Sequence, residues 1–463
     1  MRADDLLIPV PRGELRYRCI LCGESFPLDR FLYTCPRCGG LLRIEDLAFD
    51  ELKEIPPEVW KEVFDRRLSM REEPLKGIFL FYELILPVIP LEDVIYLGEG
   101  HTPVVRANEE ICGWVGAPFL LKYDGLNPSL SFKDRGMASA VSFIHYMIRR
   151  RGVGQVLGIC ASTGDTSAAA ALYLSYLPKE RVRSVVLLPE GRVTAAQLSQ
   201  PLGAGATVIE VPGVFDDCMR IVEELAERYE VCLLNSKNPL RIQGQKTYAY
   251  EVAQQLGWDT RGLVVVVPIG NAGNVTAIME GFVDLYQLGV IEELPTILGV
   301  QSEHANPLVL WRRTGEYRPV KVRPSVAQAA MIGNPVSFPK VAQLVERYYQ
   351  DRFFVVEVSE SEIMEGMLVT NRHGHVVCTQ GGEAVAGLRK ALSEGVISPE
   401  GKRFVVKSTA HHLKFAGFQQ MYFDDSFPPE YGVKTKEDLK NHPVKLPAKA
   451  SEIARFLGLK PKK

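Results

Sequence analysis

The chain has 463 residues, 46% of them hydrophobic and 24% charged, and its 54 basic and 56 acidic residues leave a formal net charge of −2. This length exceeds what one ordinary hydrophobic core supports, so we expect two or three domains. The near balance of charge argues against a nucleic-acid-coating surface and against a polybasic membrane anchor.

The amino-terminal stretch "MRADDLLIPVPRG" has no apolar core of a signal peptide, and no apolar run reaches membrane-spanning length. We therefore expect the protein to work in the cytoplasm. In that compartment its nine cysteines should be thiols or metal ligands and not disulfides.

Residues 1–48 carry four cysteines at metal-ligand spacing among short strand-like pieces. Cys19, Cys22, Cys35 and Cys38 form two C-x2-C pairs that 12 residues separate. Four thiolates meet the tetrahedral demand of Zn²⁺ and leave no open position for water, so the spacing predicts a structural and not a catalytic zinc. A degenerate ribbon held by packing and an iron site are the alternatives.

The other cysteines share no ligand spacing, and we interpret them as buried thiols. They are Cys112, Cys160, Cys218, Cys232 and Cys378. Several arginines lie near the ribbon, and we interpret them as a solvated surface and not as a nucleic-acid site.

Beyond the ribbon, residues 49–98 are rich in Glu, Pro and Leu and should be helical and connecting. From about residue 100, short apolar runs such as "GLVVVVPIG" alternate with helical segments such as "VTAIMEGFVDLYQLG". This alternation predicts βαβ units and mainly parallel sheets with helices on both faces.

The segment "NPSLSFKDRGMA", residues 127–138, puts Lys133 where turn residues give way to a helix. Ser131 and Asp134 fit a capping box, so Ser131 is the expected N-cap and Lys133 falls in the first helical turn. The helix dipole and burial both disfavour an ammonium there, so the pKa of Lys133 should fall and leave an amine able to form a Schiff base. A surface lysine paired with Asp134 is the alternative.

Two polar loops each join an apolar strand to a helix. The first, in "CASTGDTSAAAALY", offers hydroxyl and N–H groups that suit a carboxylate, and the second, in "PIGNAGNVTAIM", can direct N–H groups at a phosphate. The second loop is neither a Walker A motif nor a dinucleotide fingerprint. Either loop alone fits an ordinary capped turn, but both together with a first-turn lysine favour a ligand site. The loop residues are Ser162, Thr163, Gly164, Asp165 and Thr166 in the first, and Gly270, Asn271, Ala272, Gly273 and Asn274 in the second.

At these residues the chain resembles the threonine synthases, within the fold-type-II pyridoxal-phosphate (PLP) enzymes. The matching motifs run in family order from about residue 98 to 415, and the ribbon is similar to the amino-terminal module of some members. They are "EGHTPV", "NPSLSFKDRGM", "ASTGDTSAAAA", "AAQLSQPLGAGA", "NSKNPLRIQGQKT", "PIGNAGN" and "STAHHLK".

The resemblance implies an α/β fold with two open, mainly parallel sheets covered by helices, like tryptophan synthase β, after a small zinc ribbon. The ribbon would occupy residues 1–48. A large PLP-binding domain would combine 49–150 with 259–463, including the tail, and a small α/β domain would span 151–258.

The resemblance also implies how the cofactor is held. Lys133 would bind PLP covalently and then act as acid and base. The loop 270–274 would hold the cofactor phosphate, and Thr409 would hydrogen-bond the pyridine nitrogen. Asp165 takes the place of an asparagine that contacts the phenolic oxygen in many relatives, and plant-like members share the aspartate.

For the substrate, the resemblance implies two anion subsites. Ser162, Thr163 and Thr166 would hold the substrate carboxylate. The substrate phosphate would bind Asn235, Ser236 and Arg241, whose guanidinium fork suits it. The stretch "VVCTQGGEAVAGL" departs from the proline-containing pattern of many relatives, which bears on substrate choice.

The implied activity is that of a PLP-dependent carbon–oxygen lyase, a threonine synthase that converts O-phospho-L-homoserine and water to L-threonine and phosphate. The resemblance further implies a homodimer, and we expect neither a nucleic-acid nor a membrane partner. One alternative is β-replacement on O-phosphoserine, as in cysteate synthase. Dehydration of serine or threonine is a second, against which the phosphate subsite argues. A third is an inactive paralogue whose ribbon is a binding module, against which Lys133 and the two loops argue.

Overall fold

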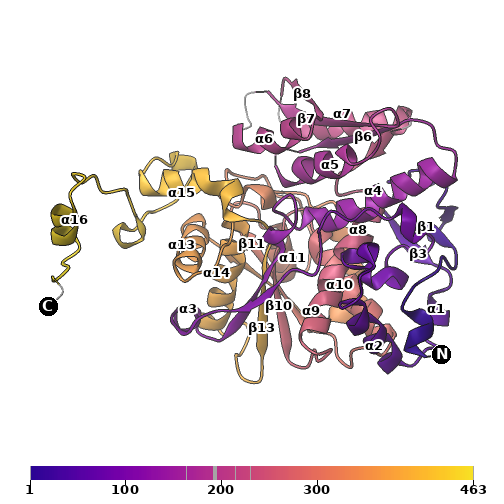
Figure 1. The fold of residues 1–463 in the computed structure, drawn as a ribbon, viewed down its shortest axis with the longest axis horizontal. Helices are drawn as coiled ribbons and strands as arrows, with labels where there is room; N and C mark the ends of the chain where they lie inside the picture. Colours follow the sequence, from indigo (N-terminus) through magenta and orange to yellow (C-terminus); the bar gives the residue numbers. More distant parts are fainter. Residues whose placement is uncertain (1, 163, 191–194, 214, 230, 462–463) are drawn as a thin grey trace.

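The computed structural model describes residues 2–162, 164–190, 195–213, 215–229 and 231–461, and three sheets organise them (Figure 1). An antiparallel sheet of three strands lies near the amino terminus, a parallel sheet of four strands lies at the top of the view, and a mixed sheet of six strands lies at the centre. The two larger sheets and their helices confirm the predicted α/β fold with mainly parallel sheets.

The small amino-terminal sheet has the strand order β2-β1-β3. We call residues 15–46, which contain it, the ribbon. Its own small core contains Tyr17 and Leu42 with the cysteines Cys19 and Cys35. Its strands are β1 (Leu15–Cys19), β2 (Ser25–Pro27) and β3 (Leu42–Asp46). The connecting segment follows with α1 (Phe49–Leu52), α2 (Pro57–Arg67) and the 3-10 turns η2 (Glu73–Leu75), η3 (Ile78–Leu84) and η4 (Leu91–Asp93).

The six-stranded sheet has the order β12-β11-β10-β13-β5-β4, and only the β4–β5 pair is antiparallel. Its central strand reads "LVVVVP" and is buried throughout. Val265 and Val267 face one hydrophobic core, while Val264 and Val266 face another, as strand alternation requires. The strands are β4 (Val104–Arg106), β5 (Phe119–Tyr123), β10 (Leu263–Pro268), β11 (Thr296–Ser302), β12 (Phe353–Val358) and β13 (Arg403–Ser408).

Helices cover both faces of this sheet. One core takes residues from α4 (Lys133–Arg150), α8 (Pro239–Gln245), α9 (Thr247–Gln255) and α10 (Gly273–Gln287). The other takes residues from α3 (Glu109–Val115), α13 (Glu360–Arg372) and α14 (Thr379–Ser393). The remaining helices are α11 (Pro307–Thr314), α12 (Phe338–Leu344), α15 (Ala416–Phe423) and α16 (Ala450–Phe456).

The four-stranded sheet has the order β8-β7-β6-β9, and all its pairs are parallel. β9 is therefore an edge strand that pairs only with β6. The strands are β6 (Val156–Ala161), β7 (Val182–Pro189), β8 (Thr207–Val211) and β9 (Val231–Leu233), and the helices are α5 (Asp165–Ser175), α6 (Ala195–Gly203) and α7 (Phe215–Arg228).

The carboxyl-terminal segment leaves the body of the molecule, and α16 stands apart from the sheets at the left of the view (Figure 1). No residue of α16 is buried. Among the described residues, no helix combines the length and the apolar character that crossing a bilayer requires.

Candidate active site

A cavity of about 920 Å³ lies where the carboxyl ends of strands from the two larger sheets meet. Ala161 and Pro268, the last residues of β6 and β10, line it, and Thr409 lines it just after β13. Ligands of parallel α/β sheets bind at such strand ends. The predicted residues that line this one cavity are Lys133, Ser162, Asp165, Thr166, Asn235, Ser236, Arg241, Gly270, Asn271, Ala272, Gly273, Asn274 and Thr409. Thr163, the other predicted substrate residue, lies outside the described residues.

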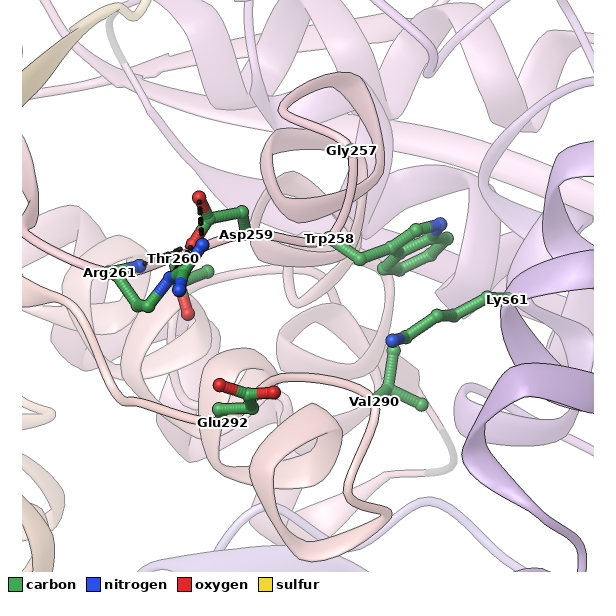
Figure 2. Close-up of a pocket in the computed structure, with 8 residues that line it drawn as sticks. All are labelled: Lys61, Gly257, Trp258, Asp259, Thr260, Arg261, Val290 and Glu292. Carbon is green, nitrogen blue, oxygen red and sulfur yellow. Dashed lines mark hydrogen bonds and ion pairs between the residues drawn. The ribbon is translucent and has the colours of Figure 1, made fainter.

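A smaller hollow of about 180 Å³ lies near the amino ends of β10 and β11 (Figure 2). Three of its charged side chains already form ion pairs: Lys61 binds Glu58 at 2.9 Å, and Arg261 binds Asp259 at 2.9 Å. None of the predicted site residues lines it. We therefore take the large cavity as the candidate site.

Lys133 is the first residue of α4, so its predicted place in the first helical turn is confirmed. The predicted capping box is wrong. Phe132 is the N-cap, the Ser131 hydroxyl accepts from the Lys133 N–H at 3.2 Å, and the Asp134 carboxylate binds Ser129 instead, accepting from its N–H and its hydroxyl at 2.6 Å. The Asp134 carboxylate is unavailable for the box because it already accepts from Ser129. The Ser131 backbone forms an isolated antiparallel bridge with Ala410.

That bridge brings Thr409 to the start of α4. The Phe132 N–H donates to the Thr409 carbonyl at 2.9 Å. Gly125 lets the two segments approach, because a Cβ there would lie 2.6 Å from the carbonyl carbon of Ala410. The Thr409 hydroxyl lies 3.4 Å from the Cys378 thiol and lines the cavity. Of the five cysteines predicted to be buried, four are, while Cys112 is half-buried.

The Lys133 amine is in an environment that favours its neutral form. Burial, together with the charges of Arg241 and Lys407, lowers its pKa to about 7, although the Asp165 carboxylate opposes the shift. The direction agrees with the sequence-based expectation, and burial is its largest cause.

Two glycines bring Arg241 close to this lysine. A Cβ at Gly244 of α8 would lie 1.9 Å from the Arg135 carbonyl oxygen in α4, and a Cβ at Gly136 would lie 3.0 Å from the Arg241 carbonyl oxygen. Only glycine permits such backbone contact. The two helices therefore pack closely enough for Lys133 and Arg241 to line the same cavity.

Arg241 is a buried guanidinium that lacks a carboxylate. Its side chain is 2% exposed, and its Nη1 donates to the Leu234 carbonyl at 2.9 Å. Its Nε has no hydrogen-bond partner, and no carboxylate of the described ranges pairs with it. Burial lowers its pKa to about 10. A buried charge without a partner is costly, so an anion in the cavity would complete this environment.

Asn235 follows β9 and joins it to β6. Its Oδ1 accepts from the Ala161 N–H at 2.9 Å, and its Nδ2 donates to the Ala161 carbonyl at 2.7 Å. One amide N–H remains available for a ligand. Ser236 lines the cavity beside it.

The loop 270–274 forms a turn between β10 and α10. Ala272 has the left-handed φ of 60°, which is uncommon for a residue other than glycine and which often marks a functional turn. Asn271 fixes the loop by accepting from the Val336 N–H at 2.8 Å. Both amide atoms of Asn274 are buried and lack partners, and the first N–H groups of any helix are unpaired within it. The loop therefore presents unused donors to the cavity.

The start of α5 places a carboxylate, that of Asp165, in the cavity lining. Asp165 is the first residue of α5, and its carboxylate pairs with the Lys414 ammonium at 3.1 Å. The same ammonium donates to the Ser129 carbonyl at 2.9 Å and to the Gln200 amide oxygen at 3.0 Å. Lys414 thus joins the segment before α4 to two helices of the four-stranded sheet. The sequence analysis missed it, although it ends the motif "STAHHLK".

An irregular segment between α11 and α12 closes another side of the cavity, and the sequence analysis missed it too. The sequence of this segment has no periodic pattern that could have predicted which of its residues line the cavity. They are Val320, Lys321, Val322, Gln328, Ala329, Ala330, Met331, Ile332, Gly333, Asn334 and Val336.

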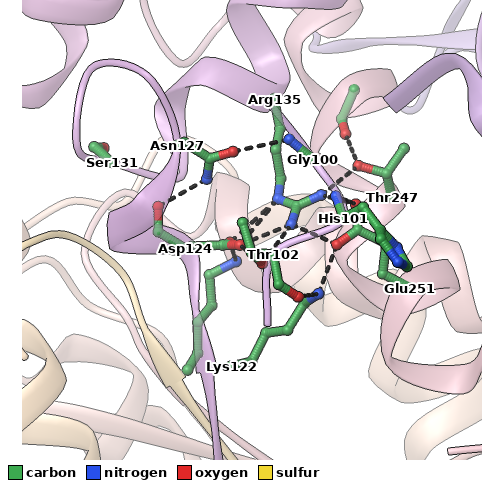
Figure 3. Close-up of polar contacts among 12 residues, drawn as sticks. Gly100, His101, Thr102, Lys122, Asp124, Asn127, Ser131, Arg135, Thr247 and Glu251 are labelled. Carbon is green, nitrogen blue, oxygen red and sulfur yellow. Dashed lines mark hydrogen bonds and ion pairs between the residues drawn. The ribbon is translucent and has the colours of Figure 1, made fainter. Parts of the chain in front are cut away.

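A network of buried charges lies next to the first turn of α4 (Figure 3). The Arg135 guanidinium donates to Asp124 at 2.7 Å and to Glu251 at 2.6 Å. The Lys122 ammonium donates to Glu251 at 2.6 Å, and the Lys407 ammonium pairs with Asp124 at 2.7 Å. Although burial opposes the shift, the charges of Arg135 and Lys122 lower the pKa of Glu251 to about 2. Each charge in this network has an opposite charge beside it.

Comparisons with known proteins agree with this geometry. The family model described as pyridoxal-phosphate dependent enzyme matches residues 95–409. The chain belongs to the pyridoxal-phosphate-dependent enzyme family.

Among its relatives, the threonine synthase of Methanocaldococcus jannaschii is 35% identical over 443 residues, which cover 95% of this chain and 98% of that protein. Threonine synthase 2, chloroplastic, of Arabidopsis thaliana is 33% identical, over 94% of this chain and 82% of that protein. The crystal structure of threonine synthase from Escherichia coli has a TM-score of 0.67 at 20% identity, and the match covers 96% of this chain and 99% of that one.

The residues present fit the cofactor of this PLP-dependent family. The unpartnered Asn274 amide and the first turn of α10 suit a phosphate, and Lys133 offers an amine with a lowered pKa in the same cavity. Thr409 and Asp165 add a hydroxyl and a carboxylate to the lining.

The four ribbon cysteines come together as the spacing predicts. Their sulfur atoms all lie within 4.8 Å of one another, with 3.5 Å between Cys19 and Cys38 and 3.7 Å between Cys22 and Cys35. Tetrahedral zinc bound to four sulfurs separates them by about 3.8 Å, so the arrangement fits a metal ion.

Proposed function

We propose that the protein is a threonine synthase, which converts O-phospho-L-homoserine and water to L-threonine and phosphate with PLP. The observation that carries the proposal is Arg241, a buried guanidinium without a carboxylate in the same cavity as Lys133. A substrate with an amino group and a separate phosphate matches this pair. The similarity to curated threonine synthases over nearly the whole chain supports the same reading.

We propose that Lys133, Thr409 and Asp165 hold the cofactor ring and that the loop 270–274 holds its phosphate. When bound, PLP supplies the electron sink that delocalises negative charge from the substrate carbons. The left-handed Ala272 turns the loop so that the Asn274 amide and the helix N–H groups reach one anion.

Lys133 is the acid and base of this mechanism. Its pKa of about 7 leaves a large share of the amine neutral at pH 7 to 8, so it takes a proton from Cα of the bound substrate, releases it, and then takes one from Cβ. Phosphate leaves from Cγ, and Lys133 passes the proton from Cβ to Cγ, which becomes the methyl carbon. Water then adds its hydroxyl at Cβ while its own proton goes to the departed phosphate, and Lys133 returns a proton to Cα.

Arg241 binds the substrate phosphate and stabilises the anion as it departs, because no carboxylate among the described residues pairs with its charge. Ser236 and the remaining Asn235 N–H add hydrogen bonds. Ser162 and Thr166 bind the substrate carboxylate in the cavity, which orients Cα toward Lys133. The family resemblance assigns Thr163 the same role.

The test is a product assay on the PLP-loaded protein with O-phospho-L-homoserine, and O-phospho-L-serine serves as the matched phosphoester. We expect threonine and phosphate in equal amounts from phosphohomoserine and slower turnover of phosphoserine. Absence of threonine, or faster turnover of phosphoserine with an added nucleophile, would reject the assignment.

Other assignments extend this proposal. We propose that the four ribbon cysteines bind one structural zinc, which metal analysis of the purified protein tests. The homodimer, the cytoplasmic location, the lack of nucleic-acid and membrane partners and the domain limits at residues 48, 150 and 258 stay predictions.

A further inference from the structure

One side chain of the ribbon reaches the edge of the four-stranded sheet. Tyr33, between the two cysteine pairs, donates from its hydroxyl to the Val231 carbonyl at 3.2 Å and accepts from the Leu233 N–H at 2.8 Å. Its ring packs on the core that contains Ile159 and Leu187. Because β9 is an edge strand, these two backbone groups have no strand partner, and Tyr33 takes the place of one.

Contacts within the ribbon fix the chain both before and after Tyr33. On one side, the Tyr17 hydroxyl, 1% exposed at the residue level, donates to the Arg30 carbonyl at 2.8 Å. On the other, Cys35 belongs to the four-sulfur cluster. Phe31 also packs edge-on against Phe143 of α4, with ring centres 6.2 Å apart.

The same ribbon contacts helices on the other side of the cavity. The Lys340 ammonium of α12, which is buried, donates to the Leu42 carbonyl at 2.7 Å. Gln343 of α12 donates to the Ile20 carbonyl at 2.9 Å. α12 follows Val336, whose N–H donates to Asn271 of the loop 270–274. In Figure 1, β1 and β3 lie beside α8 at the right of the view.

The residues that directly follow β9 in the chain belong to the phosphate subsite of the proposed function. Leu234 follows β9, and its carbonyl accepts the only hydrogen bond described for the Arg241 guanidinium. Asn235 and Ser236 come next and line the cavity. A shift of β9 would therefore move the acceptor that orients Arg241.

We propose that Tyr33 is a positioning residue for the substrate phosphate, through which the metal-held ribbon fixes β9 and so Arg241, Asn235 and Ser236. The ribbon then acts on substrate binding without contacting the substrate. The identity of the ligand rests on the proposed function, whereas the contact with β9 does not.

The test compares Tyr33→Phe, which keeps the ring and removes the hydroxyl, with Tyr229→Phe, which changes an exposed tyrosine near the same sheet. In the PLP-loaded protein, we expect Tyr33→Phe to raise the KM for O-phospho-L-homoserine about two- to tenfold, as for one hydrogen bond, with kcat and PLP content unchanged. Tyr229→Phe should leave the KM at the wild-type value.

Hydrogen–deuterium exchange gives a readout that does not depend on activity. Residues 231–236 should exchange faster in Tyr33→Phe than in the wild type, while β10 should be unaffected. Removing the ribbon metal with a chelator should have the same regional effect, which added Zn²⁺ should reverse.

Two results would contradict the inference. Unchanged exchange at 231–236 would show that Tyr33 does not hold β9. Faster exchange with an unchanged KM, or with a fall in kcat alone, would break the link to the phosphate subsite. A wild type that forms no threonine would reject the proposed function, yet the exchange result would still decide whether the ribbon holds β9.

Discussion

Two sets of buried charges lie near the first turn of α4, and they differ in whether the protein supplies their partners. Around Arg135, each charge meets an opposite charge at 2.6–2.7 Å. Around Arg241, the part of the chain that the structure describes gives the guanidinium one backbone acceptor and no carboxylate. Removing one member of the paired set leaves a buried charge without a partner and so destabilises the fold. The unpaired guanidinium, in contrast, can bind a charged ligand.

Breaking the paired set should have the largest effect. Arg135→Met leaves Asp124 and Glu251 buried with less positive charge, and we expect it to lower the free energy of unfolding by about 3–5 kcal/mol. Urea denaturation measures the loss. Arg228→Met, at an exposed arginine of α7, is the control and should change it by less than about 0.5 kcal/mol. Equal stability of both variants would contradict the comparison.

Lys133 should matter for chemistry and not for folding. Lys133→Met should lose the covalent cofactor that borohydride reduction fixes onto the wild type, and threonine formation should fall by about 10²–10⁴-fold or more, because no acid and base remains. Lys53→Met, at an exposed lysine, should retain both. A variant with normal activity would exclude Lys133 from the mechanism.

The lowered pKa of Lys133 predicts a pH dependence of the cofactor-free protein. Its folded-state pKa of about 7 lies below the ordinary 10.5, so the unfolded state binds more protons between these values and stability rises with pH across them. The stability gained by Lys133→Met should thus be largest below pH 7 and vanish toward pH 10.5. A gain that does not change with pH would mean that the Lys133 pKa is not depressed.

The smallest effect should come from Asn274, whose amide lacks partners. Asn274→Ala should leave the stability of the cofactor-free protein unchanged and weaken PLP binding about two- to tenfold, the effect of one hydrogen bond. Asn238→Ala is the contrast, because Asn238 is buried and bonds Leu233 and Leu240. It should destabilise the fold. A reversed order would contradict the assignment of Asn274 to the ligand.

Local sequence predicted the alternation of strands and helices, Lys133 and the two polar loops. The family resemblance supplied the other predicted residues of the cavity, which are Asn235, Ser236, Arg241 and Thr409. Lys133 opens its helix as predicted, because the transition from turn residues to a helical run is a local signal. The capping box failed because the Asp134 carboxylate binds Ser129, which precedes the four residues of the box. A pattern within four residues carries no information about that partner.

The charge network and the ribbon contacts were missed for the same reason. Arg135 and Glu251 lie 116 positions apart, and Tyr33 and Leu233 lie 200 apart. Lys414 is a further case, since its three acceptors come from three separate segments. Such partners meet only after the sheets and helices have packed.

The central claim is that Arg241 is held without a carboxylate so that it can bind a phosphate. The direct measurement is the urea midpoint of the PLP-loaded wild type and of Arg241→Met as inorganic phosphate is added. A bound anion stabilises the folded state by an amount that grows with the ratio of its concentration to its Kd, so the wild-type midpoint should rise with phosphate and the variant's should stay constant. Equal rises in both proteins would contradict the claim.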